Sequence, residues 1–380
     1  MNLLFVTRFY PDARIGGIER VTGLLAKYFH EKGIQVYCLY FESSEYGGGL
    51  DDVIQAYRLN DLYDEPWIQS YLTRNDIKVV INQSHFFYTP FLSKVVHAAG
   101  AKLITCCHSS TSMKTLCKRD AIKQNHGLKR MLISVAYPVF KVFSERKLKK
   151  IHRTSLESSD KTIVLSKSIK AQYASILGID ATDKRLDYIC NPLSFDCSIS
   201  EKDLANKENI ILVVARLYEP QKRLTLLFKA WQQMQCDDWR LVVVGDGEDR
   251  AMYENMVDRL HLKNVYFEGV QNPMPYYHKA KIFAMTSSWE GFPMTILESF
   301  QMGVVPVVMD SFPAAKDMIQ DGENGYLVDD GDTLAFAKYL QIMMVDNDKV
   351  MQLASNACAS SKIYNISEIG AQWMKLFNVL

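Results

Sequence analysis

The sequence predicts an α/β protein made of two doubly wound parallel-sheet domains that face each other across a cleft. The chain has 380 residues, which is long for one hydrophobic core and comfortable for two domains. Short apolar segments alternate with helical segments, the pattern of parallel sheets covered by helices. This alternation occurs once in each half of the chain, so each half is expected to form its own sheet.

In the first half, five short segments are apolar almost throughout, as strands covered on both faces should be. These predicted strands are Asn2–Thr7, Gln35–Phe41, Ile77–Asn82, Lys102–Cys107 and Lys161–Leu165. A helix is predicted from Ile18 to Lys32, and Gly33 stands where a helix C-cap glycine is expected.

The second half repeats this order of strands and helices. Its predicted strands are Asn209–Ala215, Arg240–Val244, Asn264–Glu268, Lys281–Thr286 and Val304–Val308. Its predicted helices are Arg223–Met234, Asp249–Leu260, Met294–Met302 and Thr333–Met344. Ligands of such sheets bind at the carboxyl ends of the strands, so we examine the residues that follow each strand.

The boundary between the domains is expected between Cys190 and Asn206, where prolines, serines and charges interrupt the periodicity. We therefore predict a first domain over residues 1–195 and a second over residues 196–362. The last segment, residues 363–380, has a helical apolar stripe and is expected to pack back on the first domain.

Composition excludes several classes of protein. With 48% hydrophobic and 23% charged residues, the chain is neither disordered nor fibrous. Its longest apolar run, near Met131–Phe140, is too short to span a bilayer. The first residues are interpreted as a strand rather than a signal peptide. Eight scattered cysteines without a CxxC pair favour a reducing compartment, so we expect a cytoplasmic protein.

Charge is distributed unevenly. Residues 1–190 carry 27 basic and 18 acidic side chains, whereas the rest carries 17 basic and 25 acidic ones. Most of the excess lies in residues 113–153, with 12 basic and 2 acidic side chains. The part from Leu128 to Arg153 mixes apolar and basic positions and is interrupted at Pro138. It is interpreted either as a helix on anionic lipid headgroups, at the inner face of the plasma membrane, or as an ordinary solvated helix face. Nucleic acid is not an expected partner.

The segment Trp289–Glu298 follows a predicted strand and opens a helix, so its backbone amides are expected to point at an anion. Gly291 would allow a ligand to approach the backbone closely. Glu290 lies in the loop and Glu298 in the first turns, so both are placed to face one pocket. The alternative is a structural role: Thr295 and Glu298 have the spacing of a capping box, and Glu290 would then be solvated.

Arg216 and Lys222 lie between the end of a strand and the next helix. With Arg223, Lys222 is predicted at a helix N-terminus, where the helix dipole disfavours cations by roughly 0.3–1 kcal/mol each. A bound diphosphate would explain these cations, and exposed surface charge is the alternative.

Weaker signals follow other strands. Gly16-Gly17 opens the first predicted helix without the full GxGxxG pattern, and Gly245-Asp-Gly247 follows another strand. His108 and His85 also follow strands, and a lone histidine is more often structural than catalytic. The acidic cluster at residues 329–332 is interpreted as a loop with a helix N-cap rather than a metal site.

Taken together, these motifs resemble the retaining GT-B glycosyltransferases of family four, the glycosyl transferases group 1. The resemblance is strongest from Asn209 to Val328, which contains Ala-Arg-Leu followed by Lys222, Val-Val-Gly-Asp-Gly, and Glu290 with Glu298. The glycine loop Gly16-Gly-Ile-Glu and the length agree. The family fold is two Rossmann-like domains.

The resemblance implies a role for each matching residue. Arg216 and Lys222 would hold the donor diphosphate and stabilise the leaving group. Glu298 would bind the ribose and Glu290 the sugar hydroxyls. The remaining donor-site positions would surround the sugar and phosphates, and they are Gly16, Gly17, Gly245, Gly291, Phe292, Met294 and Thr295. His108 would touch the sugar or help to place the acceptor.

The resemblance also implies the reaction. We expect a hexosyltransferase that moves a sugar, with retention, from a UDP-sugar to a hydroxyl of a saccharide or lipid-linked saccharide, in cell-surface polysaccharide synthesis. No metal and no other cofactor is expected, because Arg216 and Lys222 would neutralise the diphosphate. A nucleotide-sugar epimerase, a phosphorylase and a non-catalytic nucleotide-sugar or membrane-binding module are the alternatives.

Three positions depart from the family pattern. Ala215 stands where glycine is common, Asn191-Pro192 where Asn-Gly is common, and Ser311-Phe-Pro-Ala-Ala replaces a glycine-rich turn.

Overall fold

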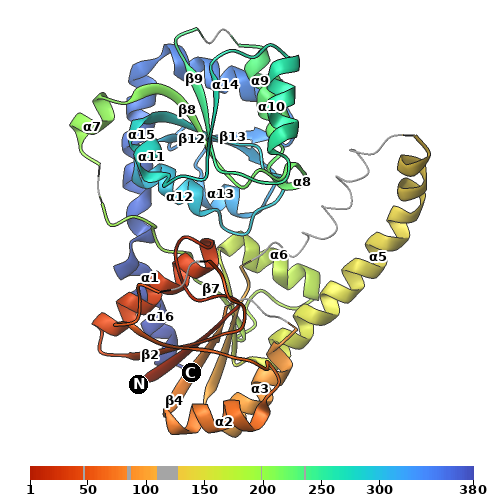
Figure 1. Ribbon diagram of the computed structural model, residues 1–380, viewed down its shortest axis with the longest axis vertical. Coiled ribbons are helices and arrows are strands. Elements are labelled where there is room, and N and C mark those ends of the chain that lie inside the picture. The colour runs from red at the N-terminus through yellow and green to blue at the C-terminus, as the bar shows by residue number, and fades with distance from the viewer. Residues whose placement is uncertain (46–47, 84–86, 109–126, 198, 235–236) are drawn as a thin grey trace. The chain divides into compact units, whose positions relative to one another are not determined.

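The computed structural model describes the chain except residues 46–47, 84–86, 109–126, 198 and 235–236, and it describes only the backbone of residues 127–136 and 138–140. The described residues form two compact units, each built around one parallel β-sheet (Figure 1). The first unit holds the parts of the chain up to Ser194, apart from residues 127–141, together with Tyr364–Leu380. The second holds Phe195–Ile363 and residues 127–141.

The sheet of the N-terminal unit has seven strands, all parallel, in the order β3-β2-β1-β4-β5-β6-β7. Its strands are β1 (Asn2–Thr7), β2 (Gln35–Tyr40), β3 (Ile54–Arg58), β4 (Ile77–Asn82), β5 (Lys102–Cys106), β6 (Lys161–Val164) and β7 (Leu186–Tyr188). The order reverses between β1 and β4, which is the topological switch point of a doubly wound sheet.

The described helices of this unit are α1 (Gly17–Glu31), α2 (Glu65–Arg74), α3 (Thr89–Ala98), α5 (Gly127–Ser158, of which residues 142–158 belong here), α6 (Lys167–Leu177) and α16 (Ile366–Phe377). Although α16 is the last of these helices along the chain, it packs on α1, the first of them. Phe377 contacts Phe29 with ring centroids 5.3 Å apart, and Gly370 lies directly against the ring of Tyr28. The last helix thus closes the core of the first unit.

Helix α5 differs from the sequence prediction. The predicted interruption at Pro138 is wrong, because the helix is continuous from Gly127 to Ser158 (Figure 1). Buried hydroxyls anchor its end in the core: Ser155, in the last turn, donates to Thr89, and Ser159, the residue after the helix, bonds Thr105. A buried polar contact of this kind fixes the orientation of the helix because each group needs its partner.

The sheet of the C-terminal unit has six parallel strands in the order β10-β9-β8-β11-β12-β13. Its strands are β8 (Glu208–Val214), β9 (Arg240–Val244), β10 (Val265–Gly269), β11 (Ala280–Met285), β12 (Val305–Asp310) and β13 (Tyr326–Asp329). Here the order reverses between β8 and β11. Both sheets confirm the predicted doubly wound architecture.

The described helices of this unit are α7 (Glu201–Ala205), α8 (Glu219–Lys222), α9 (Leu224–Gln232), α10 (Arg250–Arg259), α11 (Met274–Lys279), α12 (Met294–Gln301), α13 (Ala314–Met318), α14 (Thr333–Val345) and α15 (Asn347–Ser361), followed by a 3-10 turn at Lys362–Tyr364. Alternate residues of the central strands face opposite layers of helices. Ile211 and Val243 join a core with Phe228 of α9 and Phe336 of α14. The alternate residues Leu212 and Val242 are buried as well, so the sheet is covered on both faces, which explains why its strands are apolar throughout.

Among the residues that the structure describes, no helix combines the length and the apolarity that crossing a bilayer requires.

A candidate active site at the carboxyl ends of the strands

The strongest polar constellation of the C-terminal unit lies where the strand order reverses. Strands β8 and β11 are parallel neighbours, so the segments that follow them start at the same edge of the sheet. Lys222 ends α8, which follows β8, and Glu290 lies in the loop between β11 and α12. Open α/β sheets bind ligands at this point, because the two following segments diverge there and leave a crevice.

Lys222 and Glu290 form an ion pair. Lys222 Nζ lies 2.6 Å from Glu290 Oε1, and the side chains are only 15% and 11% exposed. Gln221 Nε2 donates to Glu290 Oε2 at 3.3 Å, so both carboxylate oxygens are held. In the described part of the chain, the Lys222 ammonium donates only to Glu290. Two of the three N–H groups of Lys222 are therefore left for a ligand.

Hydrogen bonds fix the turn that carries Lys222 against the segment after β11. Ser288 N donates to Gln221 O at 2.6 Å, and Thr286 Oγ1 donates to Lys222 O at 2.8 Å. The prediction of a helix opening at Arg223 is wrong in detail. Helix α8 ends at Lys222, Arg223 takes the left-handed conformation with φ of 49°, and α9 starts at Leu224. Lys222 therefore does not lie at a helix N-terminus, and the expected dipole cost does not apply to it.

Arg216 is placed differently from Lys222. Its side chain is 73% exposed, and Nη2 lies 3.8 Å from Glu248 Oε1, a loose ion pair. Its guanidinium lies 5.7 Å from the centroid of the Tyr218 ring. One cation of the predicted pair is thus held and largely shielded from solvent, whereas the other is exposed and can reorient toward an anion.

The loop after β9 explains why glycines are needed there. A Cβ on Gly245 would lie 1.9 Å from Ala215 O, and one on Gly247 would lie 2.4 Å from Leu217 O. Leu217 N donates to Asp246 O at 2.8 Å, so the two segments pack backbone to backbone. This close approach gives both glycines a structural reason and fixes the segment that carries Arg216.

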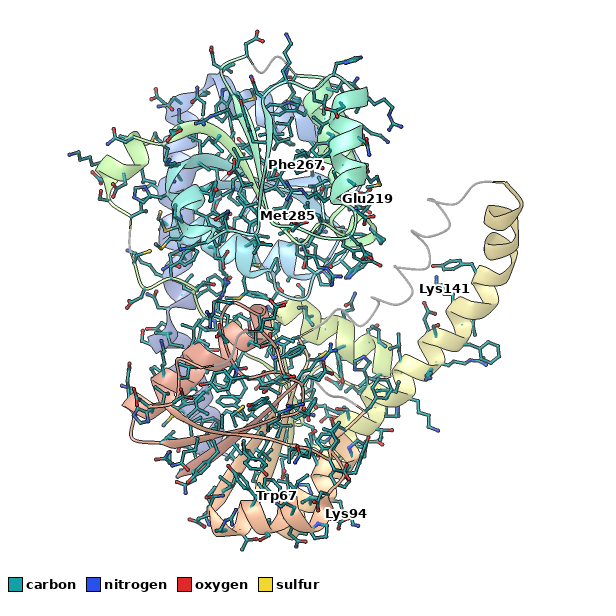
Figure 2. All side chains as sticks on the ribbon, viewed as in Figure 1. Trp67, Lys94, Lys141, Glu219, Phe267 and Met285 are labelled. Carbon is teal, nitrogen blue, oxygen red and sulfur yellow. The ribbon has the colours of Figure 1, made fainter. Side chains whose placement is uncertain are left out.

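Glu219, which is labelled in Figure 2, braces the same segment. Tyr253 Oη donates to Glu219 Oε2 at 2.9 Å, and Thr225 Oγ1 donates to Glu219 Oε1 at 2.5 Å. Burial raises the pKa of the Glu219 carboxyl, and these hydrogen bonds oppose that shift. The network joins α8 to α9 and α10.

The segment after β11 leads into α12 as predicted. Phe292 is buried, whereas Gly291, Met294 and Thr295 are partly exposed, and Glu298 is only 1% exposed. The alternative of a Thr295–Glu298 capping box is wrong, because α12 begins at Met294 with Pro293 as its N-cap and no side-chain cap. The first amides of α12 therefore have no side-chain cap, and uncapped amides at a helix N-terminus are suited to bind an anion.

In the N-terminal unit, the predicted residues also follow strands of the switch region. Gly16 is the N-cap of α1 and Gly17 its first residue, after β1. His108 follows β5, and Nε2 lies 2.5 Å from Oε1 of Gln83, which follows β4. These two side chains line a small hollow beside Val21 of α1. His85 lies outside the described residues.

The environment of His108 defines its chemistry. Burial lowers the pKa of His108 to about 4, so the ring is neutral near pH 7. With Nε2–H donating to Gln83, the unprotonated Nδ1 is the acceptor. Gln83 is 1% exposed, and among the described residues its Nε2 has no hydrogen-bond partner, as expected for a group that bonds a water or a ligand.

Sequence reasoning missed Gln221, Glu219 and Gln83 as site-forming residues, and it interpreted Arg223 only as a cation at a helix N-terminus. Gln83 had a positional signal, because it directly follows a predicted strand. The helix N-cap expected within residues 329–332 is confirmed, since the Asp332 side chain accepts from Ala335 N at 2.9 Å at the start of α14. Groups of three metal-ligating side chains are not found among the described residues.

Two family profiles together cover most of the chain. The profile "Glycosyltransferase Family 4" matches residues 15–196, and "Glycosyl transferases group 1" matches residues 196–359. This chain belongs to the group 1 glycosyltransferases. The group 1 profile covers the segment that contains Arg216, Lys222, Glu290 and Glu298.

Curated relatives include several bacterial glycosyltransferases. An α-1,4-N-acetyl-D-galactosaminyltransferase of Campylobacter jejuni, named for a PP-undecaprenol-linked saccharide, is 31% identical over 60% of this chain and 62% of its own length. The lipopolysaccharide 1,6-galactosyltransferase of Salmonella typhimurium is 31% identical over 48% of this chain and 52% of its own length. This group 1 chain thus aligns with only about half to three fifths of these relatives.

Solved structures with the same fold match over the length of the chain. Anabaena HepE, crystallised with UDP, superposes with a TM-score of 0.77 at 17% identity, and both chains are covered completely. Sucrose-phosphate synthase of Thermosynechococcus elongatus gives a TM-score of 0.78 at 16% identity, covering 99% of this chain and 98% of its own. The prediction of the GT-B class, with two Rossmann-like domains, is confirmed.

Proposed function

We propose that this protein is a retaining hexosyltransferase that moves a sugar from UDP to a hydroxyl of a saccharide or lipid-linked saccharide. The observation that carries the proposal is the Lys222–Glu290 pair at the switch point of the C-terminal sheet. A partly buried lysine with spare donors beside a carboxylate suits a ligand that is anionic at one end and rich in hydroxyls at the other.

The proposed role of each residue follows from the charge of its side chain. Lys222 and Arg216 bind the diphosphate oxygens, and their positive charge stabilises the negative charge that grows on the leaving group. Glu290 accepts hydrogen bonds from sugar hydroxyls, and the amides at the start of α12 bind sugar or phosphate oxygens. Glu298 accepts from the ribose hydroxyls.

The transfer step balances without a metal or another cofactor. The acceptor oxygen forms a bond to the anomeric carbon while the bond between that carbon and the diphosphate oxygen breaks. The proton of the acceptor hydroxyl passes to the released diphosphate, so the products are the new glycoside and UDP. The neutral His108 ring accepts a hydrogen bond from a sugar hydroxyl through Nδ1.

Relatives support the choice of donor and acceptor. HepE was crystallised with UDP and with UDP-glucose, and an Escherichia coli relative is named as a UDP-Gal:α-D-GlcNAc-diphosphoundecaprenol α-1,3-galactosyltransferase. That relative is 27% identical over 62% of this chain and 61% of its own length. We therefore place this protein in cell-surface polysaccharide synthesis.

A lipid-linked acceptor would also place the enzyme at a membrane, peripherally on the cytoplasmic face. Helix α5 supports this, because its described part exposes basic side chains, such as Lys141 in Figure 2, beside exposed Val142 and Phe143. Residues 113–126 of the basic stretch lie outside the described residues.

A panel of nucleotide sugars tests the proposal. Purified protein is incubated with UDP-, GDP- and ADP-sugars, with and without crude undecaprenol-linked saccharide, and free nucleotide is measured. UDP release that requires the acceptor supports transfer, and the anomeric configuration of the product follows from its NMR coupling constants. Release of UDP without acceptor, or no release with any donor, contradicts it.

The same assay separates the alternatives. An epimerase would interconvert the sugar of the donor, and a phosphorylase would require inorganic phosphate. A non-catalytic module would bind UDP without turnover, and its binding would be the only property that Arg216→Ala changes.

A further inference from the structure

We propose that Arg223 is a positioning residue that holds Lys222 at the donor diphosphate by tying the Lys222 turn to the carboxyl ends of three neighbouring strands. The inference rests on the proposed function, and it assigns to Arg223 a role that acts through Lys222 rather than through contact with the substrate.

The contacts of the guanidinium reach all three strands. Arg223 Nε donates to Thr286 O at 2.8 Å, and Nη2 donates to Ser287 O at 3.0 Å, just after β11. Nη2 also lies 3.8 Å from Met309 Sδ in β12 and 2.5 Å from Asp330 Oδ1, just after β13. A planar fork of donors suits such a set of acceptors, and a lysine ammonium does not.

The positive charge of Arg223 is already paired with a carboxylate inside the protein. Its side chain is 11% exposed, and Asp330 pairs with it. A cation that binds a diphosphate needs donors that point at the ligand, as Lys222 has. Arg223 instead uses three of its five N–H donors on two backbone carbonyls and one carboxylate, so its function is to hold the scaffold.

The backbone supports the same conclusion. Arg223 has φ of 49°, a left-handed conformation that is unfavourable for residues with a side chain. Such strain persists where the surrounding structure fixes it, often next to functional groups. Here the Thr286 hydroxyl bonds both Lys222 O and Arg223 O, at 2.8 and 3.1 Å. Two sets of contacts therefore hold the turn that positions Lys222: the hydrogen bonds from the Thr286 hydroxyl to the backbone, and the hydrogen bonds of the Arg223 side chain.

A double-mutant cycle tests the inference. Affinity for UDP is measured by calorimetry in wild type, Arg223→Ala, Lys222→Ala and the double variant. We expect Arg223→Ala to bind UDP at least about tenfold more weakly, a free-energy change of about 1.4 kcal/mol. In the Lys222→Ala background the same change should alter affinity by less than about twofold, since the group that Arg223 positions is gone.

Further variants separate positioning from stability. Arg223→Lys should restore only part of the affinity and of kcat, because it keeps the charge and loses the fork. Asp330→Asn keeps the shape of the carboxylate and removes its charge, and it should reproduce a smaller loss that also depends on Lys222. Arg240→Ala, which removes an exposed ion pair at the start of β9, is the matched control and should bind UDP as wild type does.

The outcomes distinguish this inference from the proposed function. Wild-type affinity in Arg223→Ala, or equal losses in both backgrounds, overturns the positioning role. If Arg223→Ala does not fold, the Asp330→Asn cycle decides by the same criterion. Wild-type affinity in Lys222→Ala shows instead that the diphosphate is bound elsewhere, which contradicts the proposed function itself.

Discussion

Lys222 and Glu290 are 68 positions apart in the sequence and 2.6 Å apart in the structure. Each was identified from its position after a strand. The order of these residues along the chain then supported the resemblance to the family. Their direct pairing was not predicted, because spacing along a chain does not say which side chains meet across a sheet. The contacts of Arg223 were not predicted for a related reason: the sequence placed it with Lys222 as a cation at a helix N-terminus, and no sequence pattern marks an arginine in a left-handed turn.

The pKa of His108 leads to a prediction about how the reaction rate depends on pH. Its pKa is lowered to about 4 by burial, so the ring stays neutral at every pH above about 5. The pH profile of kcat/KM should therefore have no limb near 6.5 that belongs to His108. His108→Ala should lower turnover, because the Nδ1 acceptor is lost, without moving the acid limb of the profile. A limb near pH 6.5 that vanishes in the variant would contradict this assignment.

Gly245 gives a prediction on stability. Its φ is 131°, and a Cβ would overlap Ala215 O, so Gly245→Ala should lower the free energy of unfolding by more than about 2 kcal/mol. Gly322 is the matched control in the same unit. It has φ of 74° with no atom near the added Cβ, so Gly322→Ala should cost about 1–2 kcal/mol from backbone strain alone. Denaturant unfolding of both variants measures the difference, and equal losses would refute the packing argument.

At the scale of elements, the sequence predicted those that are apolar and central. All ten predicted strands exist, with ends that differ by at most two residues. The edge strand β3 was missed because four of its five residues are exposed, so it lacks a continuous apolar run. Strands β7 and β13 have only three and four residues, too few to show a period. Their positions are fixed by tertiary pairing with β6 and β12.

Helix α5 gives a prediction on membrane binding. Lys147, Lys149 and Lys150 are exposed on its described part, near exposed Phe143. Changing the three lysines to glutamine should weaken sedimentation with phosphatidylglycerol vesicles, roughly in proportion to a contribution of about 1 kcal/mol per charge. Turnover of a soluble acceptor should stay unchanged. As a control, the same charges are removed at Lys263, Lys279 and Lys338, in the other unit. Equal vesicle binding by the α5 variant and wild type would remove the membrane proposal.

For the whole molecule, the buried Lys207 links stability to pH. It is 7% exposed, its ammonium lies 2.8 Å from Tyr277 O, and burial lowers its pKa to about 7. In the unfolded chain a lysine titrates near 10.4, so the unfolded state binds more protons between pH 7 and about 10. The unfolding free energy contributed by this group therefore rises with pH across that window, and below pH 7 the cost of burying the charge is complete.

Lys207→Met tests this linkage. The variant should gain stability relative to wild type near pH 7, by an amount on the order of a few kcal/mol less the lost hydrogen bonds, and this advantage should shrink toward pH 10. Urea midpoints of both proteins at pH 7, 8.5 and 10 measure the trend. A difference that does not change with pH would show that Lys207 keeps its ordinary titration when folded.

The packing of α16 on α1 has a consequence for biosynthesis. A ribosome completes the continuous segment Phe195–Ile363 before it makes Tyr364–Leu380, which the core around Tyr28 and Phe29 requires. The half of the protein that is translated first is therefore the half that matures last. Until the final helix emerges, the nascent chain exposes an aromatic surface on α1, and a chaperone that binds aromatic segments would find its target there.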